Sequence, residues 1–129
     1  MKVLALDYGS ARTGVAVSDP TGTLARPLGV VERVGTEEGL AQLRRVIGEE
    51  RPERVVVGLP LTLHGSHGVQ ARETERFVQI LRDLLEVPVE LYDERFTTDL
   101  AGGGGDAPED ARAAAHLLSD YLAWTSRQS

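Results

Sequence analysis

The sequence predicts an α/β protein built on one mixed five-stranded sheet with helices on both faces. Two observations lead to this fold class. The first 32 or so residues hold three short apolar runs separated only by turns, which is typical of an antiparallel meander. After them, segments with helical periodicity alternate with apolar runs, which is typical of βαβ units. The 129 residues are a usual length for one domain, so we expect a single domain over residues 1–129.

The meander comes first. Residues 2–7 (KVLALD) and 14–18 (GVAVS) are apolar, and a glycine-rich turn joins them. The segment 19–22 (DPTG) has Pro at the second and Gly at the fourth position of a β-turn. A third strand is expected near residues 27–32.

A helix and a buried strand follow. In TEEGLAQLRRVIGEE the apolar residues recur at steps of three and four, so one helix face is apolar, and Thr36 is placed to cap it. The continuous apolar run ERVVVGLP is what a parallel strand covered on both faces requires.

The rest of the chain repeats this alternation. Residues 70–86 predict a second helix, and the run PVELYDER predicts a fifth strand. The glycines at 102–105 predict a flexible loop, and a last helix is expected over roughly 108–125. Five apolar side chains of the second helix are expected to face inward: Phe77, Ile80, Leu81, Leu84 and Leu85.

Composition narrows the class of protein. The net charge of −6 weighs against a protein that coats nucleic acid, although it allows an enzyme that grips nucleic acid at one site. All but one of the 14 basic residues are arginine, which suits bidentate phosphate contacts. The chain has no cysteine for a thiolate metal site and no apolar stretch long enough for a membrane span. Without a recognisable signal peptide, we expect a cytoplasmic protein.

Carboxylates stand at the ends of predicted strands. Asp7 ends the first strand, and Asp93 and Glu94 end the fifth. Because side chains alternate along a strand, at most one of this pair faces Asp7, and the spacing leaves open which one. Asp110 begins the inward face of the last helix, where an acid is also explained by the helix dipole alone.

If these acids lie close together, the repulsion between their negative charges must be compensated. Two unit charges 4 Å apart repel by about 4 kcal/mol at an effective dielectric constant of 20. A proton, nearby arginines or a divalent cation can relieve that repulsion. Oxygen ligands without Cys or His suit a hard ion, so we expect Mg²⁺ or Mn²⁺ as the cofactor and a phosphodiester as the substrate.

The loops at the same sheet edge carry further candidates. Gly9 allows a sharp turn or a close approach to a ligand, and Arg12 projects beside Asp7. Arg12 can reach a phosphate or form a surface salt bridge, and both interpretations stay open. His64 and His67, in the loop LPLTLHGSHG, can contact substrate or simply be exposed to solvent.

Four motifs together resemble the YqgF family, also called RuvX-like. The family pattern D-x-G-x-x-R-x-G is matched by DYGSARTG, and V-G-L-P with a glycine-containing loop is matched by VGLPLTLHG. The pattern D-E-R-x-T-T is matched by DERFTT, and D-x-x-A-A before a leucine-rich helix is matched by DARAAAHLLSDYL. The matches follow one another in the family's order over residues 1 to about 124.

The resemblance implies a ribonuclease-H-like fold and metal-dependent hydrolysis of nucleic acid. The family is described as a nuclease for the 5′ end of precursor 16S ribosomal RNA, and also as resembling Holliday junction resolvases. Carried over, its acidic residues fall on Asp7, Glu94 and Asp110 as catalytic residues and metal ligands. Five further residues of these motifs and loops are expected to bind substrate: Gly9, Arg12, Arg95, Thr97 and His64. Of these, His64 stands where the family commonly has Asn or acidic residues. Arg95 is equally suited to hold Asp93.

Departures from the family pattern keep rivals open. The segment DLAGGGGDAPED lacks the basic residues that the family usually has there, which favours a non-catalytic RNA- or ribosome-binding module. A junction resolvase would need a two-fold dimer, so monomer and homodimer both remain possible. Actin-like ATPases and sugar kinases share the opening D-x-G, but they need a second domain that this length does not hold.

Overall fold

The computed structural model describes residues 1–59, 69–93 and 109–128. Its elements follow the predicted order β-β-β-α-β-α-β-α. The bounds are β1 Val3–Asp7, β2 Arg12–Ser18, β3 Ala25–Glu32, α1 Glu37–Glu50, β4 Arg54–Leu59, α2 Val69–Leu84, β5 Val89–Asp93 and α3 Glu109–Gln128.

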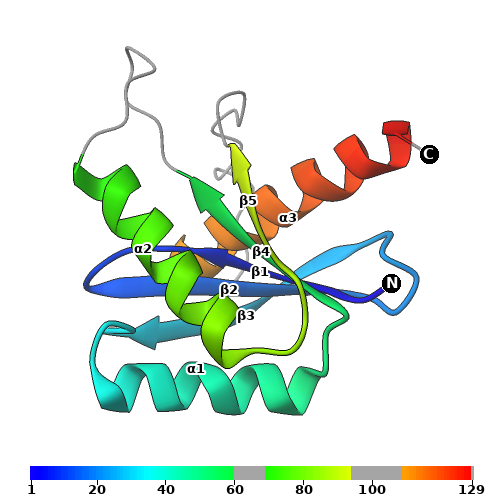
Figure 1. The fold of residues 1–129 in the computed structure, drawn as a ribbon. Helices are drawn as coiled ribbons and strands as arrows, with labels where there is room; N and C mark the ends of the chain where they lie inside the picture. Colours follow the sequence, from blue (N-terminus) through cyan, green and yellow to red (C-terminus); the bar gives the residue numbers. More distant parts are fainter. Residues whose placement is uncertain (60–68, 94–108, 129) are drawn as a thin grey trace.

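The five strands form one mixed sheet in the order β3-β2-β1-β4-β5. β1 pairs antiparallel with β2, and β2 with β3, while β1–β4 and β4–β5 are parallel. The meander and the parallel half are therefore both confirmed. Because β1, β4 and β5 run in the same direction, their carboxyl ends meet at one edge of the sheet (Figure 1).

Helices cover both faces of the sheet, as predicted (Figure 1). Leu4 and Leu6 of β1 pack in the core that includes α1 and α2, whereas Val3 and Ala5 pack in the core formed with α3. The alternation of β1 therefore directs the next side chain, Asp7, toward the α3 face. In β4, all three consecutive valines of the run VVV are fully buried, as a strand covered on both faces requires.

Helix α1 begins and ends as its sequence indicates. The Thr36 hydroxyl accepts a hydrogen bond from the backbone N–H of Gly39 at 3.1 Å, which confirms the cap. Leu43 and Ile47 are buried against the sheet. Arg51 ends the helix in the left-handed conformation, with its N–H bonded to the Ile47 carbonyl.

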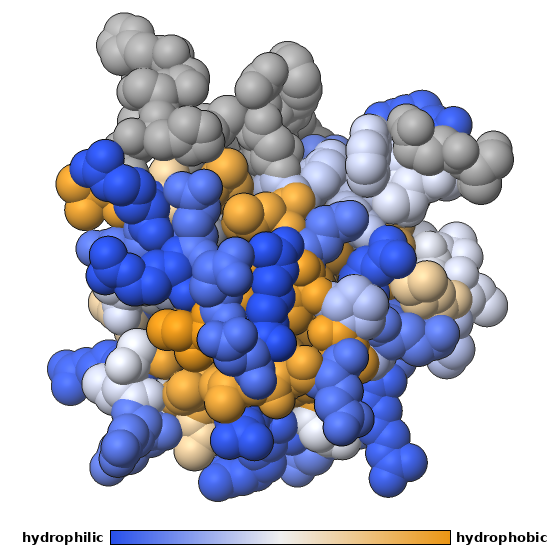
Figure 2. Space-filling view, viewed as in Figure 1, coloured by the Kyte–Doolittle hydropathy of each residue, from blue (hydrophilic) through white to orange (hydrophobic). Residues whose placement is uncertain are grey.

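The inward face of α2 was predicted partly wrongly. Ile80 is 42% exposed and Leu84 is 38% exposed. The buried residues of α2 follow a different set of three- and four-residue steps. They are Ala71, Thr74, Phe77, Val78 and Leu81. Thr74 replaces an apolar residue there because its hydroxyl donates to the Gln70 carbonyl. Figure 2 shows apolar surface on this face of the molecule, framed by hydrophilic side chains.

Helix α3 packs along the opposite face, against β1, β2 and β3. Apolar residues at steps of three and four form its inward face, and five of them are buried: Ala114, Leu117, Leu118, Tyr121 and Leu122. Asp110, at the start of this face, is only half-buried. The glycine loop predicted at 102–105 lies outside the described residues. Among the residues that the structure describes, no helix is long and apolar enough to cross a membrane.

Candidate active site

Asp7 ends β1 at the edge where the carboxyl ends of the parallel strands meet. Such edges are where open α/β sheets bind their ligands. In the β1–β2 ladder, Asp7 lies directly opposite Gly14. Opposed residues of a ladder point to the same face, so the missing side chain at position 14 leaves space beside Asp7 on the α3 face.

That space is filled by the first turn of α3. A Cβ atom at Gly14 would overlap the backbone carbonyl oxygen of Asp110, and it would also meet the amide nitrogen of Ala111 at 3.2 Å. Helix α3 thus starts in direct contact with β2, next to Asp7. The sheet and the helix therefore bring together two acids that are about a hundred positions apart in the sequence.

The two carboxylates influence each other. Burial and, as the smaller cause, the negative charge of Asp110 together raise the pKa of Asp7 from 3.8 to about 6. Near neutral pH, Asp7 is therefore ionised at a cost in free energy that a bound cation would reduce. This is the electrostatic setting expected of a divalent-ion site.

Arg12 joins the same group of side chains. Its Nε lies 3.3 Å from Oδ2 of Asp110, and the two side chains are 65% and 35% exposed. The surface ion pair that the sequence left open is therefore present. Because the guanidinium remains mostly exposed, it also keeps donors that can reach a phosphate approaching this edge.

The loop before Arg12 is held by a buried threonine. The Thr13 hydroxyl donates to the Gly9 carbonyl at 3.1 Å and accepts from the Gly9 N–H at 3.4 Å. A Cβ at Gly9 would overlap the carbonyl oxygen of Arg12, so only glycine allows this tight closure. From the other side, the Arg33 N–H bonds to the Ala11 carbonyl at 3.0 Å. These bonds fix the position from which Arg12 projects.

A hollow of about 500 Å³ opens between this loop and the first turns of α2 and α3. The loop residues 9–12 form one wall, and Asp110 forms another. Helix α2 contributes Val69, Gln70 and Glu73. Among the described residues no group of three or more His, Asp and Glu side chains is arranged to hold a metal ion. Glu94, the third acid predicted from the sequence, lies outside the described residues.

Several predicted site residues lie outside the described residues. They are His64 and His67 of the loop after β4, and Glu94, Arg95 and Thr97 after β5. Asp93 is described as the last residue of β5, which ends at the same sheet edge as β1. The placement of Glu94 as a third ligand therefore stays a prediction.

Sequence reasoning missed the contribution of α2. Tyr8 follows Asp7 and so points to the opposite face, where its ring packs against Phe77 with centroids 4.8 Å apart. Glu73, one turn before Phe77, lines the hollow. Glu73 lies three residues after Gln70 and four after Val69, so all three share one helix face. That spacing is the feature of the sequence that could have shown this group.

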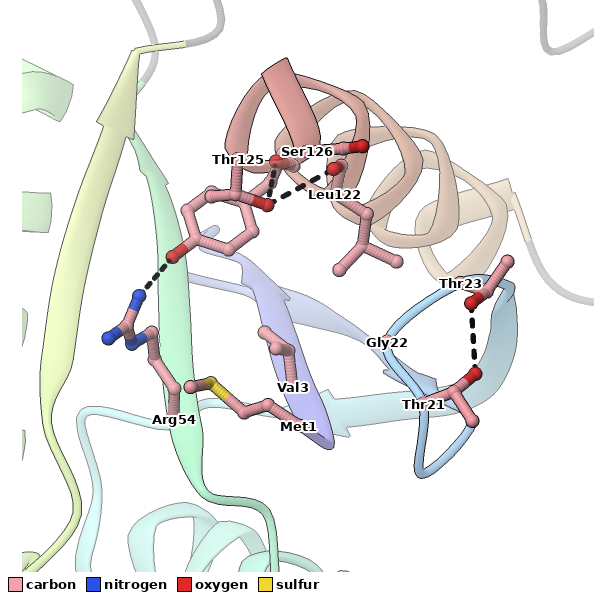
Figure 3. Close-up of a pocket in the computed structure, with 10 residues that line it drawn as sticks. Met1, Val3, Thr21, Gly22, Thr23, Arg54, Leu122, Thr125 and Ser126 are labelled. Carbon is pink, nitrogen blue, oxygen red and sulfur yellow. Dashed lines mark hydrogen bonds between the residues drawn. The ribbon is translucent and has the colours of Figure 1, made fainter. Parts of the chain in front are cut away.

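A second hollow, of about 350 Å³, lies at the other end of the sheet (Figure 3). It is lined by the start of β1, the turn at 21–23, Arg54 and the last turns of α3. Arg54 donates from Nη1 to the Tyr121 hydroxyl at 2.8 Å across it. The described residues that line it include no Asp or Glu and none of the predicted site residues, so we place the candidate active site at the first hollow.

Comparison with protein families agrees with the motifs. The family model described as "RuvX: Holliday junction resolvase" matches residues 1–124. The chain belongs to the RuvX family. This confirms the resemblance found in the sequence, because the matched range includes all four motifs.

RuvX relatives of similar length share much of the sequence. A protein of Rubrobacter xylanophilus is 45% identical over 130 residues, covering 94% of this chain and 91% of the relative. One of Chloroflexus aggregans is 41% identical over 130 residues, covering 93% and 92%. Both are named as candidate pre-16S rRNA nucleases.

Solved structures show the same fold as this RuvX chain. RuvC of T. thermophilus in complex with a Holliday junction substrate aligns with a TM-score of 0.65 at 20% identity, covering 98% of this chain and 96% of RuvC. The Holliday junction resolvase of fowlpox virus aligns with a TM-score of 0.59 at 12% identity, covering 96% and 99%. The predicted ribonuclease-H-like fold class is thereby confirmed.

Proposed function

We propose that this RuvX protein is a metal-dependent nuclease that hydrolyses phosphodiester bonds at the hollow between the loop 9–12, α2 and α3. The observation that carries the proposal is the pairing of Asp7 with Asp110. A half-buried carboxylate with a pKa of about 6 is held beside a second carboxylate at the ligand-binding edge of the sheet. Family membership and the names of close relatives support the same activity.

The residues present fit a divalent cation. Asp7 and Asp110 offer only oxygen ligands, which suit Mg²⁺ or Mn²⁺, and Glu94 is the third ligand that we propose. The repulsion between the first two acids, which raises the pKa of Asp7, would be relieved by such an ion. When bound, the ion would supply Lewis acidity toward the scissile phosphate.

The chain's own residues hold the substrate in this scheme. Arg12 pairs with Asp110 and directs its remaining donors to a phosphate oxygen, so that it both orients the acid and offsets negative charge. Thr13 and Gly9 keep the loop closed behind it. We propose that Arg95, Thr97 and His64 complete the substrate contacts.

We propose the 5′ end of precursor 16S ribosomal RNA as the substrate. The relatives at 41% and 45% identity over nearly their whole length carry that name. The test is cleavage of a precursor RNA with Mg²⁺ or Mn²⁺ by the wild-type protein and by Asp7→Asn. We expect cleavage by the wild type and a loss of about a hundredfold or more in the variant, the order of magnitude found when one group that stabilises a transition state electrostatically is removed.

Branched DNA is the second candidate substrate, because the family description names a Holliday junction resolvase. Two symmetric cuts need two sites, so this activity requires a homodimer. A four-way junction assayed beside the RNA, with the oligomeric state measured by light scattering, separates the two substrates. Equal cleavage of RNA by wild type and Asp7→Asn contradicts the proposed site, and binding without any cleavage supports a non-catalytic module instead.

A further inference from the structure

We propose that Glu73 of α2 selects RNA by accepting a hydrogen bond from a ribose 2′-hydroxyl of the nucleotide next to the scissile phosphate. The inference rests on the proposed function, since it concerns the substrate at the same hollow. It assigns a role to a carboxylate that lies outside all four sequence motifs.

The position of Glu73 supports this role. Its side chain is half-buried and lines the hollow from α2, whereas Asp110 lines it from α3 and residues 9–12 line it from the loop after β1. Helix α2 presents Gln70 and Val69 on the same face. A nucleotide bound against Arg12 and Asp110 would therefore have Glu73 at its other side.

The two acids of the hollow stand in different surroundings. Asp110 begins α3, which packs on the sheet face toward which Asp7 points, whereas Glu73 belongs to α2, whose Phe77 packs against the ring of Tyr8 on the other face. Because Asp7 and Tyr8 point to opposite faces of the sheet, Glu73 lies on the α2 side, away from the carboxylate pair. Among the described residues no cation lies within ion-pair distance of Glu73.

The chemistry of a carboxylate limits what Glu73 can recognise. An ionised carboxylate only accepts hydrogen bonds, and it repels phosphate oxygens. A nucleic acid offers it two kinds of donor, the ribose 2′-hydroxyl and the amines of bases. The 2′-hydroxyl is present on every ribonucleotide and lies near the backbone, so it suits a group beside a phosphate site. A deoxyribonucleotide would leave the carboxylate desolvated without a donor, which penalises DNA.

The experiment measures binding of a 12-nucleotide RNA and of DNA with the same bases, uracil included, by fluorescence anisotropy in EDTA. Both probes have the same charge, so the counterion contribution is the same. The wild type is expected to bind RNA about tenfold more tightly, the effect of one hydrogen bond to a charged group. A single 2′-deoxy substitution at one position is expected to reproduce that loss.

Two variants and a matched control complete the test. Glu73→Ala is expected to bind the two probes equally, while Glu73→Gln, which keeps an acceptor oxygen and the side-chain shape, retains part of the preference. Glu75→Ala removes an exposed carboxylate from the same helix and should keep the wild-type preference. Circular dichroism verifies that each variant is folded.

The outcomes separate this inference from the proposed function. An unchanged RNA preference in folded Glu73→Ala, or no preference in the wild type, overturns the role of Glu73. Cleavage of the same RNA with Mg²⁺ is measured independently. If the wild type discriminates through Glu73 but never cleaves, the nuclease proposal fails and the inference about Glu73 holds.

Discussion

The backbone carbonyl of Asp110 occupies the space that a side chain at Gly14 would fill. This contact brings the first turn of α3 against β2 at the ladder position opposite Asp7. It explains how an acid at the start of a helix becomes a neighbour of an acid at the end of a strand. Because of this contact, adding a single methyl group at position 14 should disturb the site.

Gly14→Ala is predicted to damage both the site and the fold. The added Cβ would meet backbone atoms that no side-chain rotation can move, so the start of α3 must shift. We expect a loss of about 1–3 kcal/mol in the free energy of unfolding and a larger proportional loss of cleavage. Gly29→Ala is the control, because nothing lies within 4 Å of a Cβ there. Equal stability and activity of the two variants would contradict the contact.

Asp7→Asn is predicted to stabilise the metal-free protein while removing its activity. A carboxyl group whose pKa rises from 3.8 to about 6 on folding binds its proton more tightly in the folded state. Its ionisation therefore destabilises the fold as pH rises through this range, by about 3 kcal/mol at pH 7.5 and much less at pH 4. Urea unfolding in EDTA at both pH values, followed by the fluorescence of the single tryptophan, measures the difference. A variant no more stable than the wild type at pH 7.5 would contradict the burial of Asp7.

Arg12→Ala is predicted to lower activity without lowering stability. The ion pair with Asp110 is exposed, so its loss should change the free energy of unfolding by less than about 1 kcal/mol. Loss of a charge-assisted phosphate contact should reduce cleavage about tenfold or more. Arg26→Ala is a matched control. Arg26 is 62% exposed, its Nη2 lies 3.8 Å from Oε1 of Glu50, and this ion pair does not line the hollow. Similar cleavage by the two variants would count against a substrate contact for Arg12.

Tyr121→Phe is predicted to lower stability without lowering activity. The tyrosine is buried on α3, and its hydroxyl accepts the hydrogen bond from Arg54 at the start of β4 (Figure 3). Removing the hydroxyl should cost about 1 kcal/mol of stability, the usual contribution of one such bond. Cleavage should be unchanged, since this contact belongs to the second hollow. Thermal unfolding and the cleavage assay together check both expectations, and a loss of cleavage would link the second hollow to activity.

Much of this arrangement could be predicted from the sequence because periodicity reports directly on burial. The buried stripe of α3, for example, follows the three- and four-residue spacing of its apolar residues. The inward face of α2 was predicted partly wrongly because Ile80 and Leu84 are apolar yet exposed, while the polar Thr74 is buried with its hydroxyl satisfied. Hydropathy alone does not distinguish such cases.

Other features depend on contacts between distant segments. The fit of Gly14 against Asp110 joins β2 to α3, and nothing in the local sequence of either element reveals it. The place of Glu73 in the hollow depends likewise on how α2 lies against the sheet. The four motifs contain the three acids that we propose as metal ligands, but they do not reach α2.

The central claim is that Asp7, Asp110 and Glu94 hold one divalent ion together, and Mn²⁺ binding tests it most directly. Electron paramagnetic resonance titration counts bound Mn²⁺ for the wild type and for Asp7→Asn, Asp110→Asn and Glu94→Gln, with Asp120→Asn, on α3 beyond the hollow, as the control. We predict that each of the three site variants lowers the affinity at least tenfold and that the control binds as the wild type does. Wild-type affinity in folded Asp110→Asn, or in Glu94→Gln, would contradict the shared site.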